Sequence, residues 1–414
     1  MSPLTSRHGR AWSPEDAERH LLSLELFGMR FGLDRMRRLL TVLGSPQQAF
    51  RAVHVVGTNG KSSTTRMTAA ILRAHGMRTG AYLSPHLRSF AERVRVDDAD
   101  VADQDFAIAV QRAAAAATKV DRTLEEGDRV TQFELLTAAA LWLLAEAGVE
   151  VAVVEAGLGG RFDATNVLDG SEVQVLTNVG LEHTRWLGPT VADIAGEKLA
   201  VVQPDATLAV GAGLHPDALA LAERLTAERG ARLVVAPADP GVLLQASGGF
   251  QRRNFALART AAAALLGADD EAAVIEAADI VTVPGRFELV GVQPETIVDG
   301  AHNPGGMVVL AETLREVVGD RRLVAVVSIL DDKDAAGMLR ELLPLCAEVI
   351  CTGNANRRAL PPATLESLCR QLGGPPARSV NDPRAALTEA RAAAGPDGVV
   401  LATGSIYLVA DLLR

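Results

Sequence analysis

The residues best suited to chemistry form a short glycine-rich loop, G-T-N-G-K-S-S, at 57–63. An apolar, β-branched run at 53–56 precedes it, and 64–74 has the pattern of a helix, so the order is strand, tight loop, helix. Glycine lets the backbone turn and approach a ligand closely. The loop N–H groups and the helix N-terminus attract an anion, Lys61 adds a positive charge, and a serine hydroxyl can reach Mg²⁺. The loop therefore predicts binding of a phosphate.

The loop is shorter than a Walker A motif. The pattern G-x-x-x-x-G-K-[ST] would need a glycine at the position of Val55. The structural alternative is an ordinary glycine-rich turn ahead of a surface helix.

Other strands are expected to end in polar residues at the same edge. Ser84 follows a strand at 81–83, Glu155 follows a buried strand at 149–154, and His183 comes after a strand at 173–176. Strand–helix–strand alternation predicts a parallel sheet, whose ligands gather at the carboxyl ends of the strands. The three side chains suggest a divalent metal site, with Mg²⁺ favoured by oxygen ligands and Mn²⁺ by the imidazole. The alternatives are a turn serine, a Glu155–Arg161 ion pair and an ordinary histidine.

The elements around these residues alternate between helix and strand. Helices are expected at 14–26, with Ser13 as cap, at 35–43, with Asp34 as cap, and at 131–147, where Thr131 can be the cap. A helix at 191–202 carries Lys198, and a lysine there usually faces solvent. Pro284 and Gly285 interrupt the pattern, after which a second α/β region begins. We expect two α/β domains, 1–283 and 284–414.

Length and composition fit an ordinary globular protein. A chain of 414 residues is long for one core, and its net charge of −10 argues against nucleic acid as a partner. Its three cysteines have no C-x-x-C spacing, which suggests a reducing cytosol. Residues 1–14 lack the apolar segment of a secretory signal, and no apolar run is long enough to cross a membrane. We therefore expect a cytoplasmic protein without a membrane partner.

Together the motifs resemble those of the Mur ligase superfamily, and more closely those of the folylpolyglutamate synthase / dihydrofolate synthase family. The resemblance covers nearly the whole chain. It rests on GTNGKSS (57–63), YLSPHL (82–87), FAERVRV (90–96), TQFELLT (131–137), EAGLGGRFDATN (155–166), TNVGLEHTRWLG (177–188), GEK (196–198), RNFALA (253–258), PGRFE (284–288), DGAHNPGG (299–306), SILDDKD (328–334) and TGSIYLV (403–409). Three segments depart from the family pattern: Ser62 replaces a glycine, LAVVQ follows Lys198, and Glu182 replaces a frequent aspartate.

The resemblance implies a phosphate-loop ATPase domain, a smaller Rossmann-like domain and an active site between them. It implies ATP-driven amide formation through an acyl phosphate. The acceptor would be 7,8-dihydropteroate, a reduced folate or both, the second substrate L-glutamate, the cofactors ATP and Mg²⁺, with Mn²⁺ possible, and the protein a monomer. The alternative is a Mur-type ligase with another carboxylate acceptor.

The resemblance also implies residue roles. ATP would be held by Gly57, Thr58, Asn59, Gly60, Lys61, Ser62, Ser63, Asn254, Arg286, Asp299 and His302. Metal would be held by Ser63, Ser84, Glu155, His183 and Lys198, a lysine that is carbamylated in this family. Substrate would be contacted by Ser84, Thr131, Phe133, Asp163 and Ala164, and catalysis would depend on Lys61, Glu155, His183, Lys198 and Arg286.

Overall fold

The computed structural model describes residues 10–25 and 32–414. The chain divides into two compact units, the first formed by Met1–Leu243 and Arg253–Val281 and the second by Leu244–Arg252 and Thr282–Arg414. The predicted boundary between 283 and 284 places 244–252 in the first domain. In the structure this segment joins the second unit, where Phe250 packs against the core with its ring 6.4 Å from that of Phe287.

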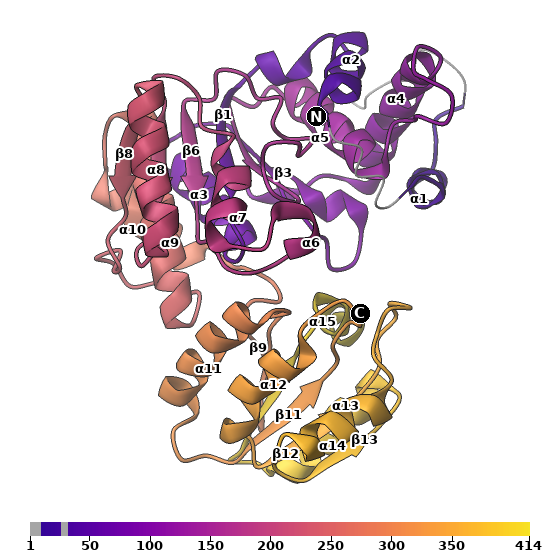
Figure 1. The fold of residues 1–414 in the computed structure, drawn as a ribbon, viewed down its shortest axis with the longest axis vertical. Coiled ribbons are helices and arrows are strands. Elements are labelled where there is room, and N and C mark those ends of the chain that lie inside the picture. Colours follow the sequence, from indigo (N-terminus) through magenta and orange to yellow (C-terminus); the bar gives the residue numbers. More distant parts are fainter. Residues whose placement is uncertain (1–9, 26–31) are drawn as a thin grey trace. The chain divides into compact units, whose positions relative to one another are not determined.

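The first unit is built on a mixed sheet (Figure 1). Among the described residues this sheet has eight strands in the order β4-β3-β2-β5-β1-β6-β7-β8, parallel except for the pairings of β3 with β2 and β4. The strands are β1 Arg51–Val56, β2 Thr79–Tyr82, β3 Val94–Val96, β4 Ala99–Asp100, β5 Val151–Glu155, β6 Val173–Leu176, β7 Thr207–Val210 and β8 Arg232–Val235. The central position of β1 places the glycine-rich loop at the middle of the carboxyl edge.

Helices α1 to α10 belong to this unit, except for the first four residues of α9, which belong to the second unit. They are α1 Pro14–Ser23, α2 Asp34–Val42, α3 Lys61–Ala74, α4 Asp103–Asp121, α5 Gln132–Glu146, α6 Thr184–Leu187, α7 Val191–Leu199, α8 Pro216–Arg229, α9 Gly249–Leu266 and α10 Glu271–Ile280. Ser13 caps α1 as expected, but the helix ends at Ser23 and not at the predicted Leu26, which lies outside the described residues, as do residues 1–9. The prediction that Asp34 caps α2 is wrong, because Leu33 is the N-cap and Asp34 the first helical residue.

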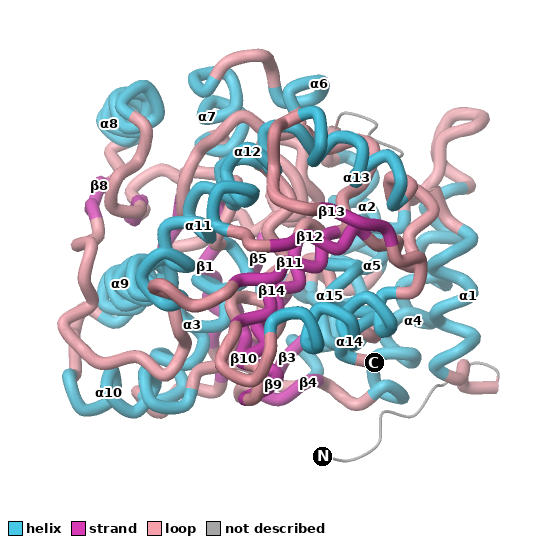
Figure 2. The backbone as a smooth tube through the Cα atoms, turned by 90° about the horizontal axis from the view of Figure 1, so that it is seen from below, coloured by secondary structure: helices cyan, strands magenta, loops and turns pink. Residues whose placement is uncertain are grey.

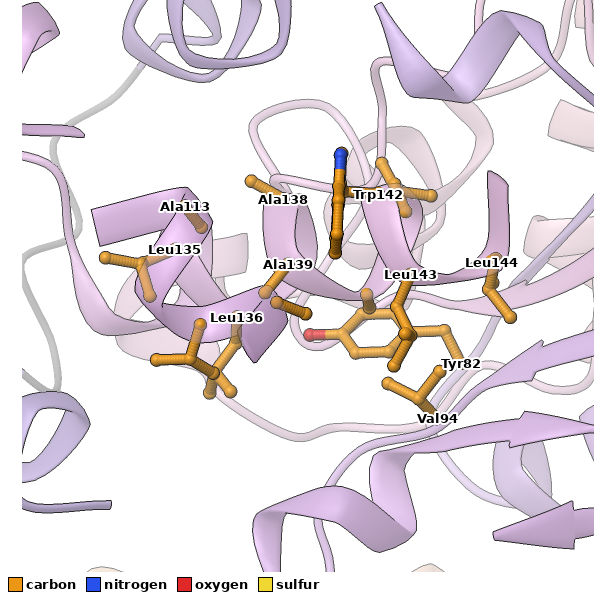
Figure 3. Packing of buried hydrophobic residues seen from close by; sticks show 14 of the residues in the cluster. Tyr82, Val94, Ala113, Leu135, Leu136, Ala138, Ala139, Trp142, Leu143 and Leu144 are labelled. Carbon is orange, nitrogen blue, oxygen red and sulfur yellow. The ribbon is translucent and has the colours of Figure 1, made fainter. Parts of the chain in front are cut away.

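One face of this sheet carries two apolar clusters. Tyr82, Ala152 and Val154 pack with α4 and α5, while Leu176, Leu208 and Val210 pack with α7 and α8. Helix α5 is apolar all round because it is buried on every side, and Figure 3 shows Tyr82 beneath it with Leu143 directed toward its ring. His54 of β1 shares this face, since side chains alternate along a strand.

The second unit holds a smaller sheet. In the part of the chain that the structure describes it has six strands, in the order β13-β12-β11-β14-β10-β9, all parallel except β9. Its elements are β9 Glu288–Val292, β10 Glu295–Val298, α11 Pro304–Val318, β11 Leu323–Val327, α12 Ala335–Leu342, β12 Glu348–Cys351, α13 Pro362–Gln371, β13 Ala377–Ser379, α14 Pro383–Ala394, β14 Val399–Thr403 and α15 Ile406–Leu413. Figure 2 shows α11, α12 and α13 on one face and α14 and α15 on the other.

Both units confirm the predicted α/β class. Each has a largely parallel sheet with helices against it, as alternating strand and helix patterns require. Among the described residues, no helix combines the length and apolarity needed to cross a bilayer.

Candidate active site

The loop at 57–63 has the backbone geometry of an anion cradle. Gly60 adopts φ +82° and is the N-cap of α3, which begins at Lys61, earlier than the predicted start at 64. Among the described residues no side chain caps this helix, so its first-turn N–H groups stay available to a ligand. A Cβ at Gly60 would lie 2.6 Å from Asn254 Oδ1, and one at Gly57 would overlap Thr177 Oγ1. Larger residues would therefore push the loop away from its neighbours.

The segment after β6 holds the loop in this conformation. Asn178 accepts hydrogen bonds from Thr58 N through its carbonyl, at 3.0 Å, and from Asn59 N through Oδ1, at 2.7 Å. Thr177 Oγ1 donates to Asn59 O at 2.6 Å, and Gly180 N donates to Thr58 Oγ1 at 3.1 Å. Thr177 and Asn178 are not among the predicted site residues, although both directly follow a predicted strand at the active edge.

Two lysines approach one carbonyl oxygen of the loop. Lys61 Nζ donates to the carbonyls of Gly57 and Thr58, each at 3.1 Å, and Lys198 Nζ of α7 donates to Gly57 O at 2.7 Å. Lys198 is only 4% exposed, so the alternative of a solvated lysine is wrong. Burial, and next the positive charge of Lys61, lower the pKa of Lys198 to about 7.

Glu155 joins the phosphate loop to the end of β2. Its Oε1 accepts from Ser62 Oγ at 3.0 Å and its Oε2 accepts from the Ser84 backbone N at 3.1 Å. The ion pair suggested for Arg161 and Glu155 is not the one observed, because Arg161 Nε lies 2.9 Å from Glu197 Oε1. Glu155 and Ser84 thus lie together at neighbouring strand ends, as the parallel topology predicts. Ser63 is buried in the first turn of α3 beside Ser62.

His183 is more exposed than Glu155 and Lys198. It is the N-cap of α6 with φ +53°, an uncommon conformation for a residue with a side chain, and 37% of its side chain is exposed. Its Nε2 lies 3.6 Å from Glu182 Oε1. Within the described residues no group of three or more His, Cys, Asp or Glu side chains is arranged around a metal position.

The donor chemistry nevertheless suits a magnesium ion. Glu155 supplies carboxylate oxygens, and the adjacent serines supply hydroxyls. Such hard oxygen ligands, completed by substrate phosphates and water, are those that Mg²⁺ prefers.

The residues predicted on the acceptor side lie where α5 begins. The Thr131 hydroxyl caps α5, accepting from Glu134 N at 3.3 Å and donating to Glu134 Oε2 at 3.0 Å, which confirms the cap interpretation. Phe133 is half-buried, and its ring covers Gly157 so closely that a Cβ there would lie 2.5 Å from Cζ. The Thr131 hydroxyl is thus occupied by the helix cap, whereas part of the Phe133 side chain remains exposed.

Asp163 organises the loop after β5. Its carboxylate accepts from Leu158 N at 2.8 Å, from Thr165 N at 2.9 Å and from Thr165 Oγ1 at 2.6 Å. Burial raises the pKa of Asp163, and these hydrogen bonds oppose that shift. Ala164 is also buried, within the cluster that contains α5.

In the second unit the predicted residues gather around 299–302. Asp299 accepts from Phe287 N at 2.9 Å and from Ala301 N at 2.7 Å, while His302 Nδ1 lies 2.9 Å from Gly300 O. The Arg286 guanidinium occupies the space that a Cβ at Gly300 would need. Burial raises the pKa of Asp299, and the charge of Arg286 acts against it. The structure thus brings Arg286, Asp299 and His302 together.

Comparisons with known proteins agree with this geometry. Residues 285–406 match the family described as Mur ligase, glutamate ligase domain. The chain is 34% identical over 383 residues to a dihydrofolate synthase/folylpolyglutamate synthase of Mycobacterium tuberculosis, covering 83% of this chain and 78% of that protein. It is 36% identical over 421 residues to a probable bifunctional folylpolyglutamate synthase/dihydropteroate synthase of Haloferax volcanii, covering 96% of this chain. The chain spans 50% of the length of that haloarchaeal protein.

Solved structures are similar over the whole chain. A folylpolyglutamate synthase of Mycobacterium tuberculosis complexed with ADP has a TM-score of 0.89 at 31% identity, covering 97% of both chains. A bifunctional folylpolyglutamate synthase/dihydrofolate synthase of Yersinia pestis, complexed with AMPPNP and Mn ion, has a TM-score of 0.86 at 28% identity, covering 98% of this chain and 99% of that one. This chain therefore belongs to the dihydrofolate synthase/folylpolyglutamate synthase family of ATP-dependent ligases.

Proposed function

We propose that this chain uses ATP to join the α-amine of L-glutamate to the carboxylate of 7,8-dihydropteroate, a reduced folate or both. The observation that carries the proposal is the position of Glu155, whose two oxygens contact Ser62 of the phosphate loop and Ser84 at the end of β2. The Glu155 carboxylate lies between the phosphate loop and the end of β2. A metal ion bound to it could therefore also contact the phosphate groups of ATP.

The phosphate loop would bind the triphosphate of ATP. The N–H groups at the start of α3, with Lys61, would hold its negative charge, and Asn254, which lies against Gly60, would contact the adenine. Arg286, Asp299 and His302 of the second unit would contact the phosphates and ribose. This assigns ATP binding mainly to 1–283, apart from 244–252, which belongs to the second unit, and the ligase domain to 284–414.

Ser63, Ser84, Glu155, His183 and Lys198 would hold the divalent cation, which neutralises phosphate charge. A lysine with a pKa near 7 is partly neutral in the cytoplasm, and the neutral amine is the form that carbon dioxide carbamylates. A carbamate would make Lys198 an oxygen ligand.

The chemistry requires positioning and charge neutralisation. The γ-phosphoryl group moves to the acceptor carboxylate, ADP leaves, and the amine of glutamate then attacks the acyl phosphate and releases phosphate. Lys61 and Arg286 would offset the repulsion between the acceptor carboxylate and the triphosphate. Phe133 would stack against the flat acceptor ring, beside Thr131, Asp163 and Ala164.

Acceptor-dependent phosphate release tests the proposal. Purified protein with ATP, Mg²⁺ and glutamate should release phosphate only after dihydropteroate or tetrahydrofolate is added. Comparing the two acceptors, with a cell-wall precursor as a third, identifies the substrate. Release with the precursor alone, or with none of them while ADP still binds, would refute the proposal.

Two variants connect the activity to the site. Lys61→Ala should lower kcat by at least about a hundredfold, because it removes a charge that stabilises the transferring phosphoryl group. Arg38→Ala, at an exposed site on α2, is the control and should keep full activity. Circular dichroism should show both variants folded, and unchanged turnover in Lys61→Ala would refute the role of that lysine.

A further inference from the structure

A buried histidine of β1 is connected to the loop after β5. His54 is 1% exposed, and its Nε2 lies 2.8 Å from Thr165 Oγ1. Thr165 Oγ1 in turn lies 2.6 Å from Asp163 Oδ1. Thr165 is fully buried and Asp163 only 6% exposed, so the three side chains form a continuous polar chain inside the unit.

The donors in this chain can be assigned. Asp163 is approached by two backbone N–H groups and one hydroxyl, as an ionised carboxylate would be, and a carboxylate can only accept. The single hydroxyl proton of Thr165 therefore points to Asp163. His54 must then donate its Nε2–H to the Thr165 oxygen, which fixes the tautomer of the imidazole.

The chain joins two functional segments that are far apart in sequence. His54 lies on β1, which leads directly into the phosphate loop, whereas Asp163 gathers the backbone of 157–166 around its carboxylate. The phosphate loop has separate supports at Thr177 and Asn178. Loss of the His54 hydrogen bond should therefore loosen the loop at 157–166 and leave the phosphate loop in place.

We propose that His54 is a positioning residue, which acts through Thr165 and Asp163 to fix the loop at 157–166 relative to β1. The effect on catalysis rests on the proposed function, because this loop carries the residues assigned to the acceptor. His54 itself touches no reacting group. Its removal should reduce use of the acceptor and not the binding of nucleotide.

Hydrogen exchange tests the positioning without any assumption about activity. The amides of Leu158 and Thr165 both donate to Asp163, so exchange in 157–166 reports on this carboxylate. His54→Leu and Thr165→Val should each speed that exchange about tenfold, the effect of losing about one hydrogen bond. His54→Gln, whose amide can donate in place of Nε2–H, should restore protection to within about threefold.

Gln174→Leu is the matched control. Gln174 is fully buried on β6, lies opposite His54 in the sheet, and bonds to Ser171 rather than to Thr165. This variant removes a buried polar group at the same depth and should leave exchange in 157–166 unchanged.

Steady-state kinetics supply the second measurement. His54→Leu and Thr165→Val should lower kcat/KM for the acceptor about tenfold, the double variant should be no worse than either, and the KM for ATP should stay within about twofold. His54→Gln should recover most of the loss.

The outcomes separate the two proposals. Unchanged exchange in both His54→Leu and Thr165→Val, or equal loosening in Gln174→Leu, would overturn the role of His54. Faster exchange with an unaltered acceptor kcat/KM would overturn its link to catalysis. A wild-type protein that turns over neither pterin acceptor, yet shows the expected exchange, would overturn the proposed function and support the positioning.

Discussion

Two ammonium groups donate to one carbonyl oxygen at the phosphate loop. Two like charges held together away from water raise the free energy of the folded state. Lys61 and Lys198 both donate to Gly57 O, and Lys198 has almost no access to water. Repulsion between the two ammonium groups disfavours the state in which both lysines are protonated, and the burial of Lys198 disfavours it further. Burial and this repulsion lower the pKa of Lys198 to about 7, so loss of its proton relieves the repulsion, and a bound triphosphate would relieve it by supplying negative charge.

Protonation of His54 should make the stability of the protein depend on pH. Burial lowers the pKa of His54 from 6.5 to about 4. Between these values the unfolded chain binds one more proton than the folded one, so this contribution is complete above about pH 6.5 and is lost as the pH falls. It amounts to about 2 kcal/mol between about pH 7.5 and pH 5.

Urea unfolding of the wild type and His54→Gln at both pH values measures this effect. The glutamine does not titrate, so its loss of unfolding free energy over the same interval should be smaller by about 2 kcal/mol. The other histidines titrate in both proteins and cancel in the difference. Equal pH dependence in the two proteins would show that His54 does not control it.

The positions of site residues could be predicted from the sequence where those residues lie directly at the end of a strand. Glu155 and Ser84 end neighbouring parallel strands, so the topology alone brings them together. His183 lies several residues beyond β6, and its exposure depends on the loop path, which no periodic pattern encodes. The roles of Asn178 and Thr165 depend on hydrogen bonds between distant segments and were not predicted.

At the level of elements, a buried ion pair attaches α2 to α5. Arg35 Nη2 lies 3.0 Å from Glu134 Oε1 and Arg35 Nε 3.2 Å from Oε2, and both side chains are 8% exposed. The same Glu134 carboxylate accepts from Thr131 N and Oγ1 at the start of α5. Arg35 thus supports the capped turn that leads to Phe133.

Removing Arg35 should destabilise the protein strongly. Arg35→Met leaves the Glu134 carboxylate without its main counter-charge in a buried position, and we expect a loss of about 3–5 kcal/mol in the free energy of unfolding. Arg38→Met is the control on the same helix. Its ion pair with Asp34 joins side chains that are 47% and 76% exposed, and we expect a loss of no more than about 1 kcal/mol.

Urea unfolding monitored by circular dichroism compares the two variants. Similar losses for Arg35→Met and Arg38→Met would mean that burial does not set the value of the Arg35–Glu134 pair.

Elements with a strong apolar period were predictable, and those shaped by tertiary contacts were not. The strand at 173–176 and the helix at 131–147 match β6 and α5 closely, because both are buried and predominantly apolar. The start of α3 was misplaced by three residues, from Lys61 to 64, since glycine as N-cap gives no side-chain signal. Strands β3 and β4 were not predicted, because they have only three and two residues, too few to show an alternating pattern.

At the level of the whole molecule, each unit has a hydrophobic core of its own. The cores of the first unit lie around α4 and α5 and around α7 and α8, while that of the second lies around β11, β14 and α11. Sequence reasoning expected two α/β regions from the interruption at Pro284 and Gly285. The same interruption does not place 244–252 in the second unit, because the contact of Phe250 with that core follows no periodic sequence pattern.

The chain carries a separate natural probe for each unit. Its three tryptophans, Trp12, Trp142 and Trp186, lie in the first unit, and its three cysteines, including the fully buried Cys351 and Cys369, lie in the second. Because each unit has its own core, unfolding in urea should give different midpoints by tryptophan fluorescence and by pulsed thiol labelling read by mass. Coincident midpoints in nucleotide-free protein would show a single cooperative unit.

Nucleotide should act on the first of these transitions. ADP at about a hundred times its Kd should stabilise the unit that holds the phosphate loop by about 2.7 kcal/mol and raise the tryptophan midpoint. Lys61→Ala is the control, because it retains the three tryptophans and removes a charge that binds phosphate. Its midpoint should respond much less to the same ADP concentration, since the stabilisation depends on the ratio of ligand to Kd. An equal shift in both proteins would mean that the nucleotide binds away from the loop at 57–63.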